Sequence, residues 1–260
     1  MTAQTHTQPA LAAPSVPWLV IICGCIIAAL TFGPRSAMGF FQLPMLAEKG
    51  WDRTTFGLAM ALQNLFWGLG LPFFGAIADR YGTWRVLTLG GFIYAAGLYL
   101  MATADSPTML HIGGGVLVGL GVAAGSFSIV LAAFARHTPP EKRSIVFGIG
   151  TAAGSAGMFL FAPISQGFID AYGWSDSLLI MAAMMLAIPV LAAPLRGSSH
   201  NASAASQAAR QTVGAALSEA FAHRSYMLLI SGFFVCGFQV AFITAHFPAY
   251  IGDLGIDARY

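Results

Sequence analysis

The sequence predicts an all-α protein that crosses a membrane several times. Hydrophobic residues make up 57% of its 260 positions and charged residues only 8%, against about 25% in typical soluble domains. Residues 56–78 and 86–104 carry no formal charge. Each is long enough to cross a hydrocarbon core, for which about 20 helical residues suffice. The net charge of +2 is too small to indicate a nucleic-acid partner, and we expect a lipid bilayer as the surroundings instead.

Seven apolar segments follow one another along the chain, each with Gly or Pro, which membrane helices tolerate. They cover residues 17–46, 54–78, 85–104, 108–135, 145–169, 174–195 and 225–251. The chain therefore divides into a tail (1–16), a six-helix transmembrane domain (17–195), a linker (196–224) and a seventh helix with the start of a further domain (225–260). Within the linker, residues 212–221 can form a surface helix.

The basic residues of the loops predict the orientation. Alternate loops carry eight lysines and arginines on one side and three on the other: Arg80, Arg85, Arg136, Lys142, Arg143, Arg196, Arg210 and Arg224 against Lys49, Arg53 and Arg259. Cytoplasmic loops of membrane proteins carry the excess of Lys and Arg. We therefore expect the N-terminus and the linker to be cytoplasmic.

Two stretches of the chain resemble each other. Gly75-Ala-Ile-Ala-Asp-Arg-Tyr-Gly82 recurs about ninety residues later as Gly167-Phe-Ile-Asp-Ala-Tyr-Gly173, without the arginine. An offset of three membrane spans inverts the second copy. Inverted three-helix repeats are typical of secondary transporters. The alternative is that the pattern is only a common way to end a helix.

The first of these stretches also resembles a known motif. Gly75-x-x-x-Asp79-Arg80-x-Gly82-x-x-Arg85 is similar to the loop between the second and third helices of the major facilitator superfamily. The resemblance implies a six-helix bundle of two inverted three-helix repeats plus one additional transmembrane helix. It also implies a gating role for the motif, in which the Asp79 carboxylate latches the cytoplasmic side closed against a helix of the second half.

Three further stretches resemble bacterial monocarboxylate transporters and oxalate–formate-antiporter-like members of that superfamily: Phe32-Gly-Pro-Arg35-Ser-Ala-Met-Gly-Phe-Phe, Gly50-Trp-Asp-Arg-Thr-Thr-Phe56 and Ala245-His246-Phe-Pro-Ala-Tyr250. This resemblance implies alternating-access transport of a small organic anion, with or without protons, across a bacterial inner membrane. It covers most of the chain from residue 17 onward. The fourth segment departs from the pattern, because it lacks the arginine that many members place there.

Such proteins have twelve spans, whereas seven are recognised here. A C-terminal half or a partner chain would supply the others. Two alternatives to an anion carrier follow from this: a half-transporter that has no activity alone, or a carrier of another solute class.

Arg35 is the first candidate for substrate binding. It interrupts a long apolar segment, and a charge at bilayer depth costs at least about 2.5 kcal/mol, so it usually faces a cavity. Gly33 and Pro34 before it can loosen the helix. A guanidinium suits a carboxylate, which it binds through two parallel hydrogen bonds. The alternative is an arginine whose long stem reaches the outer membrane surface.

Other polar residues within the apolar segments are weaker candidates. Gln63, Asn64 and Trp67 lie within one turn of the second segment, where they can contact a solute or another helix. Gln239 and His246 lie in the seventh segment, and the histidine can carry protons or lie at the interface. Gln42 is expected to be in contact with water near the end of the first segment.

Small residues predict where helices pack closely. The relevant glycines lie in the fourth and fifth segments, where a proline follows them: Gly115, Gly119, Gly150, Gly154, Gly157 and Pro163. The chain has neither a Gly-x-Ser-x-Gly nor a His-Glu-x-x-His motif, so we do not expect an enzyme. Cys23, Cys25 and Cys236 all lie in apolar runs, and we expect neither a metal site nor a cofactor.

Overall fold

A computed structural model describes residues 17–196 and 213–255 of the chain. The predicted tail, residues 197–212 of the predicted linker and the last five residues lie outside this part. The described helices are α1 (Trp18–Ser36), α2 (Met38–Lys49), α3 (Arg53–Tyr81), α4 (Thr83–Ala102), α5 (Pro107–Leu110), the π-helix η1 (His111–Leu117), α6 (Val118–Ala124), α7 (Phe127–His137), the short 3-10 helix η2 (Pro140–Lys142), α8 (Arg143–Met185), α9 (Ile188–Ala192), the 3-10 helix η3 (Ala193–Leu195), α11 (Val213–Ala222) and α12 (Arg224–Asp253).

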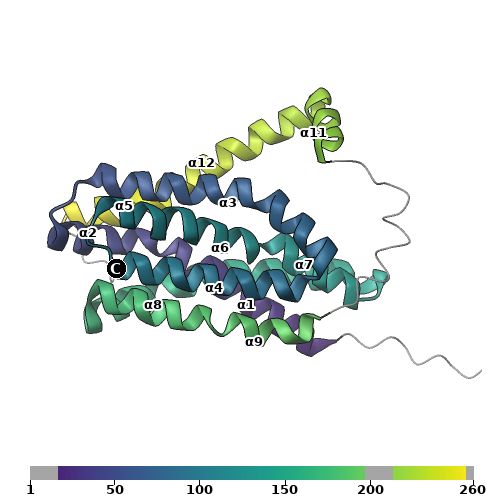
Figure 1. The fold of residues 1–260 in the computed structure, drawn as a ribbon, viewed down its shortest axis with the longest axis horizontal. Coiled ribbons are helices and arrows are strands. Elements are labelled where there is room, and N and C mark those ends of the chain that lie inside the picture. Colours follow the sequence, from purple (N-terminus) through teal and green to yellow (C-terminus); the bar gives the residue numbers. More distant parts are fainter. Residues whose placement is uncertain (1–16, 197–212, 256–260) are drawn as a thin grey trace, which may run out of the picture.

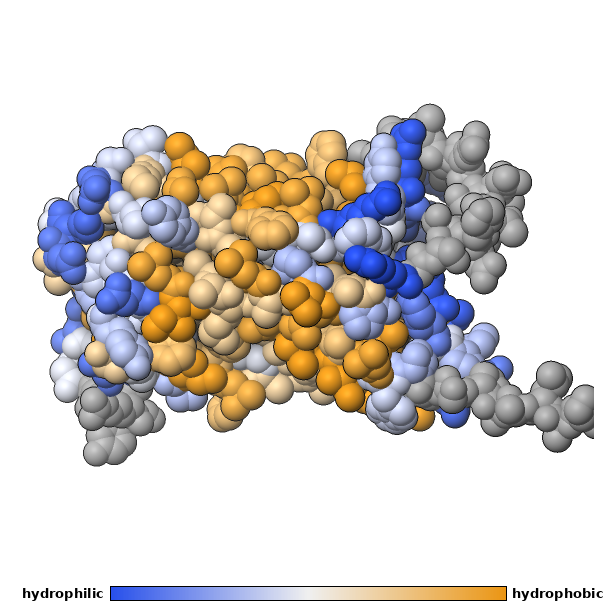
Figure 2. Space-filling model, turned by 60° about the horizontal axis from the view of Figure 1, so that its bottom comes forward, coloured by the Kyte–Doolittle hydropathy of each residue, from blue (hydrophilic) through white to orange (hydrophobic). Residues whose placement is uncertain are grey.

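The long helices run side by side along the long axis of the molecule (Figure 1). Within the described residues, six helical segments are long and apolar enough to cross a membrane. On the face shown in Figure 2, apolar residues cover the middle and hydrophilic residues gather at the two ends. The predicted all-α membrane fold is therefore confirmed. The helix expected in the second half of the linker is present as α11.

One of the six segments contains two of the predicted spans. Pro140–Leu195 is 56 residues long, which as a straight helix would measure about 80 Å against a hydrocarbon core of about 30 Å. At Gly173 the backbone leaves the helical region, with φ 81° and ψ 169°, a conformation that is essentially restricted to glycine. The chain turns there, between the predicted fifth and sixth spans.

The glycine that ends the first copy of the repeated pattern has a similar backbone. Gly82 has φ 92° and ψ 145° and lies where α4 begins. Gly173 lies where α4 ends, because Ser175, two residues later, donates a hydrogen bond to the carbonyl of Ala102 (2.9 Å). The two glycines therefore have matching backbones at opposite ends of α4. This supports two copies of one pattern with inverted orientation.

Two predicted spans are less regular than the sequence suggests. The first one bends at Ala37 between α1 and α2, since Pro34 lacks the N–H group that a continuous helix would use. The fourth one contains the π-helix η1 over its Gly113-Gly-Gly115 run and a turn at Gly125 before α7. Apolarity identifies a span, but it carries no information on such local changes of helical pitch.

Glycines bring the helices of the bundle into close contact. A Cβ atom added to Gly157 on α8 would lie 2.5 Å from the Cα of Ala29 on α1, and one added to Gly119 would lie 2.5 Å from the carbonyl oxygen of Gln63 on α3. At Gly115 the nearest atom would be the Cβ of Leu62, at 2.9 Å, and at Gly150 the ring of Phe134, also at 2.9 Å.

Two members of the predicted packing set lie in looser surroundings. The nearest atom to a Cβ on Gly154 would be 3.9 Å away, on the ring of Phe32. This is an ordinary van der Waals distance. Pro163 is exposed on α8. The close contacts of this helix are therefore concentrated at Gly150 and Gly157.

Helix α12 contacts the rest of the molecule through its second half. Ala249 is 3% exposed, and Gly39 on α2 lies against the backbone of Thr244. Its first half is exposed and leans away from α3 towards α11 (Figure 1). The two halves of α12 therefore have different surroundings, and a cleft opens between α12 and the bundle.

Candidate functional site

A cleft with a volume of about 1230 Å³ lies between α12 and the helices α1 and α3. Its walls are mostly apolar and aromatic: Phe32, Met60, Trp67, Leu71 and Met158 on the bundle, and Tyr226, Phe233, Phe234, Phe238 and Phe242 on α12. Arg35 and Asn64 also line it. Among the described lining residues, none is acidic.

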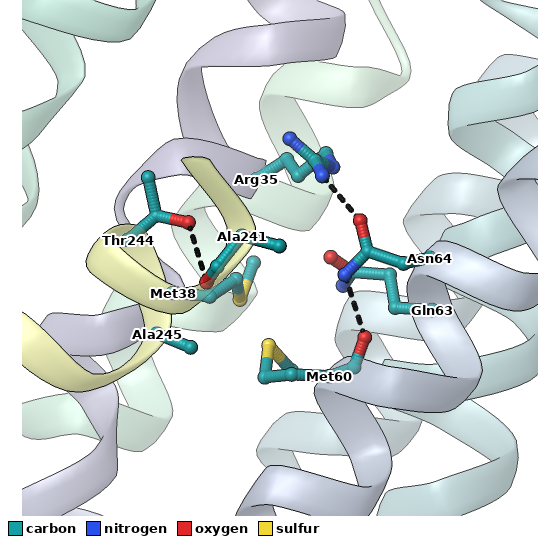
Figure 3. Close-up of a pocket in the computed structure, with 8 residues that line it drawn as sticks. All are labelled: Arg35, Met38, Met60, Gln63, Asn64, Ala241, Thr244 and Ala245. Carbon is teal, nitrogen blue, oxygen red and sulfur yellow. Dashed lines mark hydrogen bonds between the residues drawn. The ribbon is translucent and has the colours of Figure 1, made fainter. Parts of the chain in front are cut away.

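Arg35 lies near the end of α1, one residue after Pro34, and points across the cleft towards α3 (Figure 3). Its Nη2 donates a 2.6 Å hydrogen bond to Oδ1 of Asn64. Its guanidinium carbon lies 4.3 Å from the ring centroid of Trp67, within the range of a cation–π interaction. Its Nε is buried and makes no hydrogen bond. The guanidinium thus contacts a neutral amide and a ring, and no carboxylate.

The neighbours of Arg35 have fixed roles within α3. Asn64 donates through Nδ2 to the carbonyl of Met60 (2.8 Å), which leaves its oxygen for the arginine. The Trp67 ring contacts Phe32 edge-on, with 6.0 Å between centroids, and its Nε1 is buried without a hydrogen-bond partner. Two N–H donors, Nε of Arg35 and Nε1 of Trp67, are therefore still unused.

Gln63 is adjacent to this group but is held by another helix. It is 2% exposed, and its Nε2 donates a 3.0 Å hydrogen bond to the carbonyl of Gly114 in the π-helix η1. The sequence leaves open whether this amide contacts a solute or another helix. In the structure, its nitrogen contacts another helix.

The two candidates of the seventh segment lie differently. His246 lines the cleft from α12 and lies 5.1 Å from the Phe242 ring between centroids. It also lines a second cavity of about 300 Å³ together with Gln42 and the Arg53–Asp253 pair. Gln239 is exposed and is not among the lining residues of the cleft. The structure therefore brings His246, but not Gln239, to the cleft that Arg35 lines.

The prediction that Gln42 is in contact with water is wrong. The residue is 1% exposed, and neither atom of its amide makes a hydrogen bond. Its position near the end of the first apolar segment suggested water. The sequence has no local signal for this burial, because Gln42 shares its cavity with α12, two hundred residues further along the chain.

The predicted gating motif lies at the other end of α3. Asp79 and Arg80 are exposed, the Arg80 guanidinium carbon lies 5.4 Å from the Tyr81 ring centroid, and that of Arg85 lies 5.6 Å from the Trp84 ring centroid. A Cβ on Gly75 would have open space around it. Within the described residues, Asp79 makes no ion pair within 4 Å.

At the opposite end of the molecule, charged groups are paired. Arg53, the first residue of α3, makes two hydrogen bonds of 2.8 and 2.7 Å to Asp253, the last residue of α12. Lys49 lies 3.0 Å from Asp105. Trp174 donates a 2.6 Å hydrogen bond from Nε1 to Glu48. The Arg53–Asp253 pair therefore joins the end of α12 to the start of α3 at this end of the molecule.

A bundle of apolar helices with inverted repeats and a polar group beside a central cleft defines the class of multi-pass membrane transport proteins. A sequence profile of the Major Facilitator Superfamily matches residues 17–260, and the chain belongs to this family. The structure and this match together confirm the predicted resemblance.

Several individual proteins are similar to the chain. Monocarboxylate transporter 13 of Rattus norvegicus is 29% identical over 183 residues, which are 69% of this chain and 41% of that protein. Human monocarboxylate transporter 11 is 29% identical over 194 residues, 71% of this chain and 40% of that protein. The MFS-type transporter YcxA of Bacillus subtilis is 23% identical over 242 residues, 92% of this chain and 59% of that protein. The chain thus spans about two fifths of the monocarboxylate transporters that it matches.

Proposed function

We propose that the chain takes part in secondary transport of small organic anions, and that Arg35 binds the anionic group of the substrate. One observation carries this proposal. The guanidinium of Arg35 lines an apolar cleft in which none of the described lining residues is acidic. A charge in such surroundings is costly unless it has a partner.

The remaining hydrogen-bonding capacity around Arg35 favours an acceptor as the ligand. The oxygen of Asn64 is already used, whereas Nε of Arg35 and Nε1 of Trp67 are unused donors. A carboxylate has two acceptor oxygens and no donor, so it complements both groups. Among the described lining residues, Arg35 is the only lysine or arginine, and the other basic side chain is His246. A single permanent positive charge favours a monocarboxylate. The names of the mammalian relatives agree with this class.

For the transport cycle, we propose that the described conformation is open towards the cytoplasm. The cleft extends from His246 to Leu71 and Tyr226, towards the end of α3 that carries Asp79, while the Arg53–Asp253 pair closes the other end. Alternating access would require this pair to open. The motif from Gly75 to Arg85 would then hold the cytoplasmic side, as the resemblance implies. A bacterial inner membrane with a cytoplasmic N-terminus remains part of the proposal.

Ligand binding and counterflow test the proposal on this chain. Binding of lactate and benzoate would be measured by isothermal titration calorimetry in nanodiscs, and exchange of labelled lactate would be measured in liposomes. We expect Arg35→Ala to weaken binding about 30-fold or more, since the loss of one partner of a buried charge pair costs about 2 kcal/mol or more. Arg35→Lys should fall between Ala and the natural residue, because a lysine keeps the charge but loses the forked geometry.

The matched control is Arg143→Ala, which removes an arginine whose Nε bonds to the carbonyl of Thr138 outside the cleft. It should leave binding unchanged. If both Arg35 variants bind as tightly as the natural protein, Arg35 is not the anion site. Binding that depends on Arg35 without any exchange supports the alternative of a half-transporter. Arg35-independent exchange of an uncharged solute would instead support a carrier of another solute class.

A further inference from the structure

Two arginines lie against one tryptophan at the end of the molecule where α4 begins. The guanidinium carbon of Arg196, just after η3, is 4.2 Å from the ring centroid of Trp84, and that of Arg85 is 5.6 Å from the same centroid. Both arginines are exposed, and the tryptophan is half-buried. The indole therefore gathers two positive charges from segments that are more than a hundred residues apart.

Within the part of the chain that the structure describes, neither arginine forms an ion pair with a carboxylate within 4 Å. The ion pairs within the described residues, Lys49–Asp105 and Arg53–Asp253, both lie at the opposite end of the molecule. A cation–π contact at an exposed site contributes only about 0.5–1 kcal/mol, and two like charges on one ring repel each other. An anion at this position would offset the repulsion.

The start of α4 offers additional hydrogen-bond donors. No side chain caps the helix, and its first turn contains no acidic residue. The first N–H groups of a helix lack acceptors within the helix, and its positive end favours an anion. Thr83, the first residue of α4, is 2% exposed and its hydroxyl has no hydrogen-bond partner. By contrast, α3 is preceded by the N-cap residue Asp52, whose carboxylate accepts a hydrogen bond from the N–H of Thr55 (2.8 Å).

An apolar track leads away from this position along α4. Leu89 and Phe92 follow Arg85 by four and seven residues, so the three side chains lie on one face of the helix. Leu89 is 47% exposed and Phe92 53% exposed. The site thus combines a basic group at the hydrophilic end of the molecule with an apolar surface that points into the apolar band, as an anionic headgroup and an acyl chain require.

We propose that Arg85, Arg196 and the first turn of α4 bind the phosphate of an anionic glycerophospholipid, whose acyl chain lies along Leu89 and Phe92. Trp84 positions both guanidinium groups. The bound lipid links the start of α4 to the end of η3, from which the linker leaves the bundle. This site is separate from the cleft that contains Arg35.

Short-chain lipids test the site in the folded protein. Dioctanoyl phosphatidylglycerol would be titrated into the protein in an uncharged detergent at physiological salt, and bound lipid would be counted by native mass spectrometry. We expect Arg85→Gln and Arg196→Gln each to weaken binding roughly fivefold, which corresponds to about 1 kcal/mol per basic residue at a membrane surface. Lys142→Gln removes a positive charge from an exposed residue that is not one of the two cations on the Trp84 ring and should have no effect, since long-range attraction is screened at this salt.

Two further ligands separate a lipid from a soluble anion. Dioctanoyl phosphatidylcholine, which is neutral overall, should bind more weakly than phosphatidylglycerol. Inorganic phosphate should not compete at equal concentration. Equal affinity of the natural protein and both arginine variants would overturn the proposal, and so would inorganic phosphate that binds as tightly as the lipid. Should a glutamine variant fail to fold, Arg85→Lys and Arg196→Lys keep the charge but lose the forked guanidinium, and Trp84→Leu removes the ring that positions both groups. Binding as tight as that of the natural protein in all three variants would equally overturn the proposal.

Discussion

Glycines in the bundle and glycines in α12 have opposite surroundings. A Cβ on Gly119 or Gly157 would lie 2.5 Å from an atom of a neighbouring helix, whereas one on Gly232 or Gly237 of α12 would meet no atom within 4 Å. In the bundle, the missing side chain lets two backbones approach each other. In α12 it leaves open space. Composition therefore does not reveal which glycines hold the fold together, because both regions are rich in them.

The largest expected effect is at Gly157. Gly157→Ala places a methyl group against the backbone of Ala29, which cannot move without shifting α1, and overpacking of this kind costs typically 1–3 kcal/mol. We expect the free energy of unfolding to fall by about 3 kcal/mol. The measurement is the temperature at which half of the detergent-solubilised protein remains monodisperse on size-exclusion chromatography, which should be lower in the variant.

Two controls sharpen this comparison. Gly154→Ala lies one turn away on the same helix, with 3.9 Å of space, and should leave the melting temperature close to that of the natural protein. Gly232→Ala in α12 should leave it unchanged or raise it, because alanine favours a helix by about 1 kcal/mol over glycine. A similar loss for all three variants would show that the close contact at Gly157 does not decide stability.

The same contrast explains which parts of the fold were predictable from the sequence. The spans and the turns at Gly82 and Gly173 could be predicted, because apolar length and local glycine patterns are properties of neighbouring residues. The π-helix η1 could not, since it depends on packing against other helices, whereas Gly33 and Pro34 mark the region of the bend at Ala37 but not its exact residue. The packing prediction had the same limit. Gly154 and Gly157 have the same pattern in the sequence, but only Gly157 contacts a backbone.

The candidate site was predictable to a similar extent. Arg35 stands out in the sequence because a charge inside a long apolar segment is costly, and the structure places it in the cleft beside Asn64 and Trp67. The position of Gln239 depends on the rotation of α12, which its neighbours in the sequence do not fix. Gln42 depends on a contact with that same helix. Contacts that α12 makes are therefore the part of the site that was missed.

A smaller effect is expected at the helix starts, where the two regions differ again. Asp52 caps α3 through hydrogen bonds from Thr55 and Thr54, whereas His223 precedes α12 without a side-chain cap. Asp52→Ala should destabilise the start of α3, because it removes the acceptor of the Thr55 N–H. His223→Asp should stabilise the exposed start of α12. Both effects would be measured by hydrogen–deuterium exchange of the first helical turns, which should become faster in α3 and slower in α12. Unchanged hydrogen–deuterium exchange in both helices would mean that these caps do not stabilise the first helical turns of the folded protein.

The Asp52 cap also has a predictable pH dependence. Hydrogen bonds from the side chains of Thr54 and Thr55 and from the N–H of Thr55 lower the pKa of Asp52. A carboxyl with a lowered pKa in the folded state adds stability above its unfolded pKa of about 3.9, and this stability is lost as the pH falls through the folded pKa. Protection of the first turn of α3 should therefore fall on acidification below about pH 4. In Asp52→Asn, that part of the pH dependence should disappear.

The smallest effect on stability, but the most specific for α12, concerns the Arg53–Asp253 pair. The two side chains are 55% and 45% exposed, and exposed ion pairs contribute little to stability, so Arg53→Gln or Asp253→Asn should barely change the melting temperature of the bundle. Because the first half of α12 has so few other contacts, we expect a larger effect on its position. The distribution of distances between spin labels at Ala61 and Gly237 would become broader or shift to longer distances in either variant.

The exchanged pair, Arg53→Asp with Asp253→Arg, should restore the original distribution, because it rebuilds an ion pair between the same two helix ends. A distribution that is the same in all four proteins would show that α12 is held by its contact with α2 alone, and that the ion pair does not close this end of the cleft.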